Sequence, residues 1–284
     1  MSTDSPVRPR PAVFRALGRA EPPEQIAIAG RFFQHEELLK HDSWAATAIY
    51  SSRGQRIICK FHRIQPIFGV PMAWLGRRLA ARERRFLARL ADVPNVPSVL
   101  GPVTVNGQVL THAAARRYIP GHPLSPGDVV DDEFFSELRF VLQEMHGRGI
   151  AYVDLHKREN ILVGENGRPY LFDFQISVDA QRRLWRCLPG SSWFFRILCQ
   201  SDLYHLEKHI IRQQAGTDPD AEARLARLRP WWIRIHRLIA RPLREVRRKL
   251  LVFLNIRSGR GLVSSEYFAE HAIRQIRARR TSAQ

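Results

Sequence analysis

The spacing of apolar residues in the first half of the chain is typical of short strands joined by tight turns. Apolar and β-branched residues at positions 48–50 and 56–61 stand on either side of a polar turn at 51–54, which predicts an antiparallel meander over residues 35–61. A second hairpin is predicted around Asn106 and Gly107. The uncharged run 93–115 around it is long enough to cross a bilayer, but its prolines and its turn favour the hairpin.

Helical spacing first occurs over residues 77–91. The apolar stripe of this helix consists of Leu79, Phe86, Leu87 and Leu90. Glu83 lies on the same stripe, where a carboxylate is costly unless a cation or a hydrogen-bond donor meets it. A second helix is predicted from a cap at Asp131 or Asp132 to the glycines at 147 and 149. Beyond residue 184 the chain is expected to be mostly helical.

Three oxygen-bearing side chains border two short strands predicted at 161–163 and 170–172. Asp154 follows an apolar stretch, Asn160 precedes the first strand and Asp173 follows the second, so the hairpin brings them together. Such side chains suit Mg²⁺, which takes one or two carboxylates plus substrate phosphates, and a remaining carboxylate can accept a proton from an attacking hydroxyl. The alternative is that Asp154 and Asp173 only cap turns.

This region resembles the protein-kinase-like superfamily. Residues 152–163, Tyr-Val-Asp-Leu-His-Lys-Arg-Glu-Asn-Ile-Leu-Val, resemble its catalytic loop H-R-D-L-x-x-x-N, and residues 171–175, Leu-Phe-Asp-Phe-Gln, resemble its D-F-G element. By this resemblance Asp154 orients or deprotonates the acceptor hydroxyl, and Asn160 and Asp173 hold Mg²⁺ on the phosphates of ATP. The implied fold class is α+β and two-lobed, with a small β-rich N-lobe containing one key helix and a larger α-helical C-lobe.

Two further matches lie outside the catalytic loop. Lys60 occupies the place of the lysine in V-A-I-K, and Glu83 that of the acidic residue on the following helix, so the resemblance implies that Glu83 fixes Lys60 against the nucleotide. The alternative is that Glu83 points to solvent and pairs with a nearby arginine. Residues 201–206 resemble the start of the central C-lobe helix, whose Asp202 braces the catalytic loop or, alternatively, only caps a helix.

The sequence departs from the kinase pattern in four places. No glycine occurs between His35 and Tyr50, so the small residues Ser43 and Ala45 are the candidates for bringing backbone N–H groups to phosphate. Tyr and Val replace the histidine and arginine of H-R-D. One additional residue separates Asp154 from Asn160, which leaves Lys157 as a phosphate contact. Glutamine replaces the glycine of D-F-G, and there is little room for an activation segment.

The domain organisation follows from these elements. Residues 26–118 are predicted to form a nucleotide-binding N-lobe and residues 119–284 a C-lobe, with the boundary at the break in pattern over 117–121. Residues 1–25 mix proline and arginine without an apolar core, which predicts a mobile basic arm. The three cysteines form no C-x-x-C pair, which favours buried, reduced thiols and a cytoplasmic protein.

The net charge of the chain favours anionic partners. The 284 residues include 45 Lys+Arg against 27 Asp+Glu, a net charge of +18, while 44% hydrophobic residues exclude a disordered polycation. Arginines alternate with tryptophans and aliphatic residues over 229–257, and residues 184–185 and 193–197 add further aromatics, as in helices that lie on anionic membranes. The alternatives are aromatics packed inside the C-lobe, and nucleic acid binding, for which no motif is present.

The sequence therefore predicts an ATP- and Mg²⁺-dependent phosphotransferase that is cytoplasmic and peripheral at the inner membrane. The departures are typical of the atypical bacterial branch of kinases, which implies that the acceptor is a hydroxyl of a lipid-linked sugar such as lipopolysaccharide core. A RIO-like serine/threonine protein kinase is the first alternative. The second is a pseudokinase, a binding module that has lost turnover.

Overall fold

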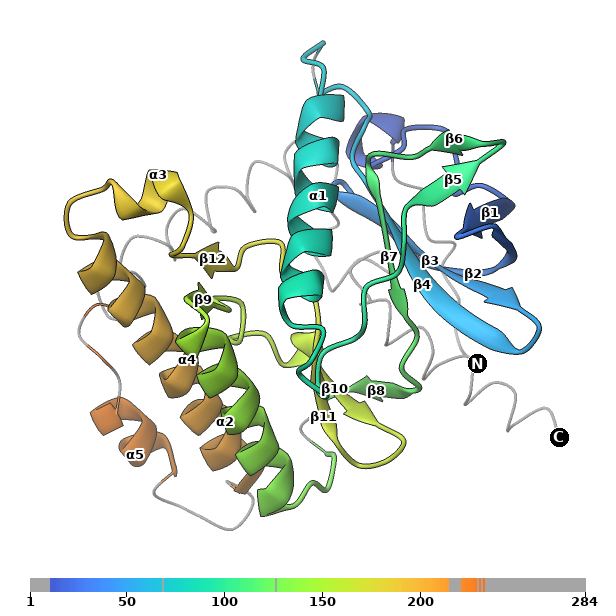
Figure 1. Cartoon of the computed structure of the whole chain (residues 1–284). Coiled ribbons are helices and arrows are strands. Elements are labelled where there is room, and N and C mark those ends of the chain that lie inside the picture. Colours follow the sequence, from blue (N-terminus) through green and yellow to red (C-terminus); the bar gives the residue numbers. More distant parts are fainter. Residues whose placement is uncertain are drawn as a thin grey trace, which may run out of the picture. The chain divides into compact units, whose positions relative to one another are not determined.

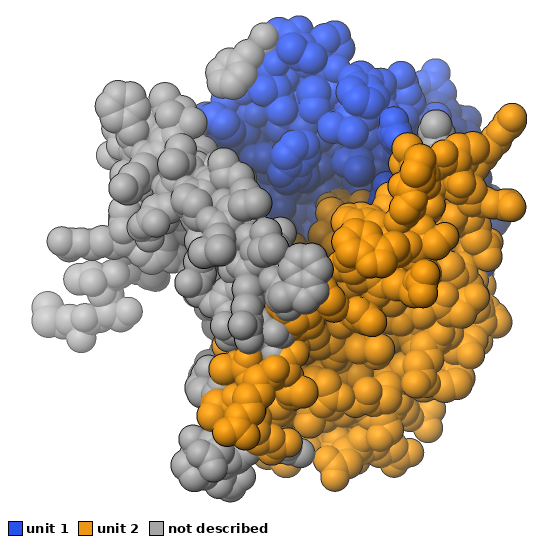
Figure 2. Space-filling model, turned by 90° about the vertical axis from the view of Figure 1, so that its left-hand side faces the viewer, with its two compact units in different colours: residues 1–88, 98–118, 244–284 blue, residues 89–97, 119–243 orange. Residues whose placement is uncertain are grey.

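The computed structural model describes residues 11–67, 69–125, 127–214, 221–228, 230 and 232. Within this part the chain forms two compact units, residues 11–88 and 98–118 (unit 1) and residues 89–97 and 119–232 (unit 2), coloured separately in Figure 2. The basic segment 229–257, predicted to contact a membrane, lies outside the described residues except for Pro230 and Trp232. The described chain is a mixed α+β protein, as the sequence predicts (Figure 1).

Unit 1 is built on a curled seven-stranded antiparallel sheet with the strand order β6-β5-β1-β2-β3-β4-β7 (Figure 1). Its elements are η1 (Ala12–Phe14), β1 (Gln25–Ile28), β2 (Arg31–His41), β3 (Ala45–Ser52), β4 (Gln55–His62), α1 (Ala73–Arg89), β5 (Val103–Val105), β6 (Gln108–Val109) and β7 (Ala113–Arg117). Both predicted hairpins are confirmed, since β3 pairs with β4 and β5 with β6. Arg53 and Gly54 have positive φ, as do Asn106 and Gly107, which two-residue turns between twisted strands require.

Alternation along the strands separates a core face from a functional face. Residues 46, 48 and 50 of β3 and 57, 59 and 61 of β4 enter the main core of unit 1. Lys60 and His62 therefore share the opposite face. Helix α1 begins at Ala73, four residues before the predicted start, and buries Gly76, Ala80, Glu83, Phe86 and Leu87. A Cβ at Gly76 would lie 2.2 Å from the carbonyl oxygen of Arg63, so only glycine fits at this contact.

The prediction of a mobile arm over residues 1–25 is wrong for the segment from η1 onward, while residues 1–10 lie outside the described part. Ala16 and Leu17 are buried, and Ala16 N–H donates to the carbonyl of Asp42 at 2.7 Å. The buried Arg63 guanidinium donates to the carbonyls of Val13 and Ser43, each at 2.7 Å. Hydrogen bonds from the buried Arg63 guanidinium thus fix this segment. The composition of the segment, on which the prediction of a mobile arm was based, carries no sign of these bonds.

Unit 2 combines helices with two small sheets of orders β11-β10-β8 and β12-β9. Its elements are β8 (Gly121–Pro123), α2 (Asp132–Gly147), β9 (Ile150–Ala151), η2 (Arg158–Asn160), β10 (Ile161–Gly164), β11 (Pro169–Leu171), β12 (Val178–Asp179), α3 (Arg183–Arg186), α4 (Ser191–Gln214) and α5 (Ala221–Leu228). The predicted α2 and the β10–β11 hairpin are confirmed. Asp131 is the cap of α2, accepting from Phe134 N–H at 2.8 Å. None of the helices in the described ranges has the length and apolar character needed to cross a membrane.

Candidate functional site

Unit 1 brings Lys60 and Glu83 together. Lys60 on β4 and Glu83 on α1 approach to 3.7 Å between Nζ and Oε2, and Nε2 of His62 lies 3.1 Å from the same carboxylate oxygen. Glu83 is only 3% exposed, so the alternative of a solvent-facing Glu83 is wrong. His62, two residues after Lys60 and on the same strand face, is a member of this cluster that the sequence analysis missed, although its spacing from Lys60 was a usable signal.

The electrostatics of this cluster keep Glu83 ionised. Burial alone raises the pKa of the Glu83 carboxyl, but the charge of Lys60, the adjacent His62 and the charge of Arg116 together hold it well below its usual value. A buried carboxylate with surrounding cations keeps a lysine ammonium in one position, which is what a phosphate-binding lysine needs.

Replacing Glu83 by Gln is expected to lower the free energy of unfolding by about 2 kcal/mol at neutral pH, because the charge-assisted contacts to Lys60 and His62 are lost. The folded-state pKa of Glu83 is lowered from 4.5, so its stabilisation is full above that value and is lost as the pH falls below it. Urea unfolding of both proteins at several pH values measures this. A difference that stays constant from neutral pH to well below 4.5 would contradict the assignment.

Ser43 lies in the turn before β3 and Ala45 is the first residue of that strand. The carboxylate of Asp42 binds the backbone N–H groups of this turn. Asp42 Oδ1 accepts from the N–H groups of Trp44 at 2.7 Å and Ala45 at 2.9 Å. Ser43 Oγ donates to the carbonyl of Phe14 at 3.0 Å. The Ala45 amide predicted to approach phosphate therefore already has an anionic partner, Asp42, whose second oxygen is paired with Lys40 Nζ at 2.7 Å. Ser43 and Ala45 are not used in the function proposed below.

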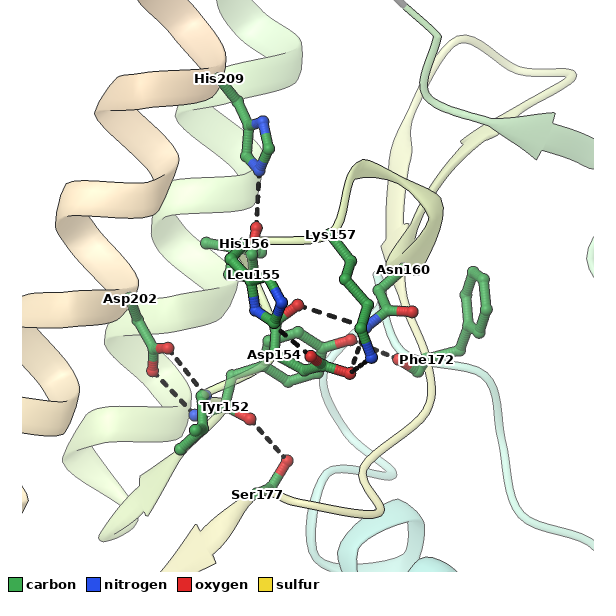
Figure 3. A network of polar contacts seen from close by, with 11 residues as sticks. Tyr152, Asp154, Leu155, His156, Lys157, Asn160, Phe172, Ser177, Asp202 and His209 are labelled. Atoms are coloured by element: carbon green, nitrogen blue, oxygen red, sulfur yellow. Dashed lines mark hydrogen bonds and ion pairs between the residues drawn. The ribbon is translucent and has the colours of Figure 1, made fainter. Parts of the chain in front are cut away.

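In unit 2, the loop after β9 gathers Asp154, Lys157 and Asn160 (Figure 3). Asp154 Oδ2 accepts from Lys157 Nζ and from Asn160 Nδ2, both at 2.8 Å. Its second oxygen, Oδ1, is buried and has no hydrogen-bond donor among the described residues, with His156 Nδ1 3.4 Å away. Two successive turns take up the residues between Asp154 and Asn160: Lys157 N–H donates to the carbonyl of Asp154 at 3.2 Å, and Asn160 N–H, in the 3₁₀ turn η2, donates to the carbonyl of Lys157 at 3.3 Å. The structure thus gives Lys157 a carboxylate partner that the sequence did not predict.

Asn160 and Asp173 supply oxygen atoms of the kind that Mg²⁺ binds. Asn160 directs its amide nitrogen to Asp154, so its amide oxygen faces away from that carboxylate (Figure 3). Burial raises the pKa of the Tyr152 phenol, and the charges of Asp173 and Asp154 raise it further, so both carboxylates act on one buried group. No cluster of three or more His, Cys, Asp or Glu side chains suited to a metal occurs in the described part of the chain. One amide and one carboxylate still fit Mg²⁺ that is held largely by nucleotide phosphates and water.

The backbone at this loop is held in an unfavourable conformation by Asp202. Val153 has φ +72°, a left-handed conformation that β-branched residues rarely adopt, and Asp173 has φ +65°. Asp202 is fully buried and accepts from the N–H groups of Tyr152 and Val153, each at 2.8 Å. Helix α4 begins at Ser191, so the predicted helix start at residue 201 and the capping role for Asp202 are wrong. The bracing of the loop by Asp202 is present in the structure, and strained residues held in this way are typical of functional sites.

His209 is a second support that the sequence analysis missed. Its Nε2 lies 2.6 Å from the carbonyl oxygen of Leu155, the residue after Asp154 (Figure 3). Burial lowers the pKa of His209 to about 4, so its imidazole is neutral near neutral pH and Nε2–H donates this bond. No spacing signal marks His209, because the contact joins residues 54 positions apart.

Comparison of the sequence with models of known protein families and with curated proteins finds no match to either.

Proposed function

We propose that the chain is an ATP- and Mg²⁺-dependent phosphotransferase with a two-lobed protein-kinase-like fold, in which unit 1 is the N-lobe and unit 2 the C-lobe. The observation that carries this proposal is the hydrogen bonding of the two carboxylate oxygens of Asp154. One carboxylate oxygen is held by Lys157 and Asn160, while the other is buried without a hydrogen-bond donor among the described residues. A buried acceptor left open beside two fixed contacts is suited to receive the hydroxyl of a substrate.

Each residue has a role in the proposed reaction. The P–O bond between the γ-phosphate and ADP breaks, a new P–O bond forms to the acceptor hydroxyl oxygen, and the hydroxyl proton passes to Asp154. Lys60, fixed by Glu83, binds the nucleotide phosphates. The amide oxygen of Asn160 and the carboxylate of Asp173 hold Mg²⁺, which neutralises phosphate charge when bound. Lys157 Nζ contacts the Asp154 carboxylate at 2.8 Å and holds it in place until the substrate arrives.

For the acceptor we propose a hydroxyl of a lipid-linked sugar such as lipopolysaccharide core, reached from the inner face of a membrane. The net charge of +18 supports this choice, because anionic lipid headgroups attract such a chain. The alternative acceptor is a serine or threonine hydroxyl of a protein, as in a RIO-like kinase.

The test is transfer of labelled phosphate from Mg²⁺-ATP by the full chain, with a lipopolysaccharide extract or anionic lipid vesicles, beside Asp173→Ala. Label in the lipid-sugar fraction that disappears in the variant is the expected result, because Asp173 is a proposed Mg²⁺ ligand. Asp132→Ala, which removes an exposed carboxylate from α2, is the matched control and should transfer normally. Label on protein alone would favour the RIO-like alternative.

A pseudokinase, a binding module that has lost turnover, is a second candidate, and one observation favours it. Asp42 already binds the Trp44 and Ala45 amides in the turn where a kinase holds phosphates with backbone N–H groups. If ATP neither binds nor turns over and no acceptor is labelled, this candidate replaces the enzyme.

A further inference from the structure

The first ten residues of α4 project apolar side chains into solvent. The second half of the helix supplies buried residues such as Leu206 and Ile211, whereas Trp193 is 57% exposed and Phe194 45% exposed. Leu188, in the turn before the helix, is also 57% exposed. Large apolar side chains that gather at one exposed place mark an interaction surface rather than a folding requirement.

Helix α3 and the start of α4 form one continuous surface. The rings of Trp185 on α3 and Phe194 on α4 lie 5.7 Å apart between centroids. Gly190, with φ +72°, makes the tight turn between the two helices, and Phe194 N–H donates to its carbonyl at 2.9 Å. We call this the α3–α4 surface, and its exposed members are Arg183, Arg186, Leu188, Trp193, Phe194 and Arg196.

The charge on the α3–α4 surface has one sign. No acidic residue occurs between Asp179 and Asp202 in the sequence. Arg183 and Arg186, together with Gln181 and Cys187, line an open hollow of about 530 Å³. Neither arginine forms an ion pair with any described acidic residue. Two guanidinium groups at a hollow are suited to a phosphate group, since their N–H groups match phosphate oxygens in geometry and charge.

We propose that the α3–α4 surface docks the protein on an anionic phospholipid membrane, with a lipid phosphate in the Arg183–Arg186 hollow and Trp193 and Phe194 at the headgroup boundary. Tryptophan and phenylalanine beside arginine are the side chains that favour this interface, and arginines near it add attraction to anionic lipids. The surface goes beyond the proposed phosphotransfer, because docking requires neither ATP nor turnover.

Vesicle sedimentation of the full chain tests whether the positive charge of the α3–α4 surface contributes to membrane binding. The chain is expected to bind vesicles of phosphatidylglycerol in phosphatidylcholine, and this binding should weaken as the salt concentration rises. Binding to vesicles of phosphatidylcholine alone should be weak. The double variant Arg183→Gln, Arg186→Gln is expected to bind the anionic vesicles about 25-fold more weakly, since each arginine near an anionic surface contributes about five-fold. Arg77→Gln, Arg78→Gln removes two exposed arginines from α1 and should bind as the unchanged protein does.

Aromatic insertion is tested separately. Trp193→Ser, Phe194→Ser is expected to lower vesicle affinity roughly ten-fold through the loss of buried apolar area, whereas Trp74→Ser, at an exposed tryptophan of α1, should not. An environment-sensitive fluorophore on the exposed Cys187, in a Cys199→Ser background, should shift to the blue only with anionic vesicles; Cys59 is buried and stays unlabelled.

Several results would overturn the docking proposal. These are equal loss of binding in the α1 control, retained binding in both surface variants, or a Cys187 signal produced by inorganic phosphate or by dimerisation without lipid. The Asp154→Asn variant should bind vesicles normally, because Asp154 belongs to the proposed catalytic loop and not to the α3–α4 surface. Loss of transfer with intact docking, or of docking with intact transfer, therefore separates the two proposals.

Discussion

Asp154→Asn is expected to lower kcat for phosphate transfer about 10²- to 10⁴-fold, the range that a positioned general base contributes. The reason lies in the two oxygens of this carboxylate. Oδ2 is held by Lys157 and Asn160 at 2.8 Å, so the side chain cannot rotate freely. Oδ1, which is buried, accepts no hydrogen bond from the described residues and lies 3.4 Å from His156 Nδ1, is the atom proposed to receive the hydroxyl proton. Asn keeps the shape of the residue but provides no carboxylate for that proton.

The measurement is single-turnover transfer from Mg²⁺-ATP, together with ATP affinity, in Asp154→Asn and in the surface control Asp132→Asn. ATP affinity should change little in both, because the nucleotide is proposed to be held by Lys60, Asn160 and Asp173. A variant that transfers phosphate at the rate of the unchanged chain would show that Asp154 is a structural capping residue, which was the alternative from sequence.

The sequence predicted those helices and hairpins that are marked by a regular apolar stripe or by turn residues. Helices α1 and α2 carry regular apolar stripes, and the hairpins have turn residues that require positive φ, so their existence follows from the sequence. The closeness of Asp154 to Asn160 also follows, because the two residues lie close in sequence and two short turns bring the chain back.

The remainder depended on contacts that local patterns do not encode. The family resemblance implied that the helix containing Asp202 starts at residue 201, whereas α4 starts at Ser191. Its first turns carry exposed Trp193 and Phe194 and therefore present no core stripe that would mark the earlier start. Residues 12–17 are fixed by the buried Arg63, which lies 50 positions from Val13. The cysteines were expected to be buried, yet Cys187 is exposed, because it lies in the exposed segment 186–190.

Asp202→Ala is expected to lower the free energy of unfolding by about 3–5 kcal/mol, the usual cost of removing one partner from a buried charged network. Its carboxylate is the acceptor for the N–H groups of Tyr152 and Val153, and His146 Nε2 lies 3.1 Å away. Alanine leaves the buried Tyr152 N–H and the partly buried Val153 N–H without that acceptor, at about 1–3 kcal/mol for a fully buried group. Urea unfolding followed by tryptophan fluorescence and by circular dichroism measures the change.

The isosteric variant Asp202→Asn separates the brace from simple loss of packing. Its amide oxygen can still accept one of the two N–H groups, whereas its amide nitrogen faces the other donor, so about half of the destabilisation is expected to remain. Because Val153 at φ +72° is held by this bond, loss of the brace allows the loop to relax away from the geometry that positions Asp154. Phosphate transfer should therefore fall in the order unchanged chain, Asn variant, Ala variant, even under conditions in which all three remain folded. Equal stability and equal transfer in all three proteins would show that Asp202 does not brace the loop in solution.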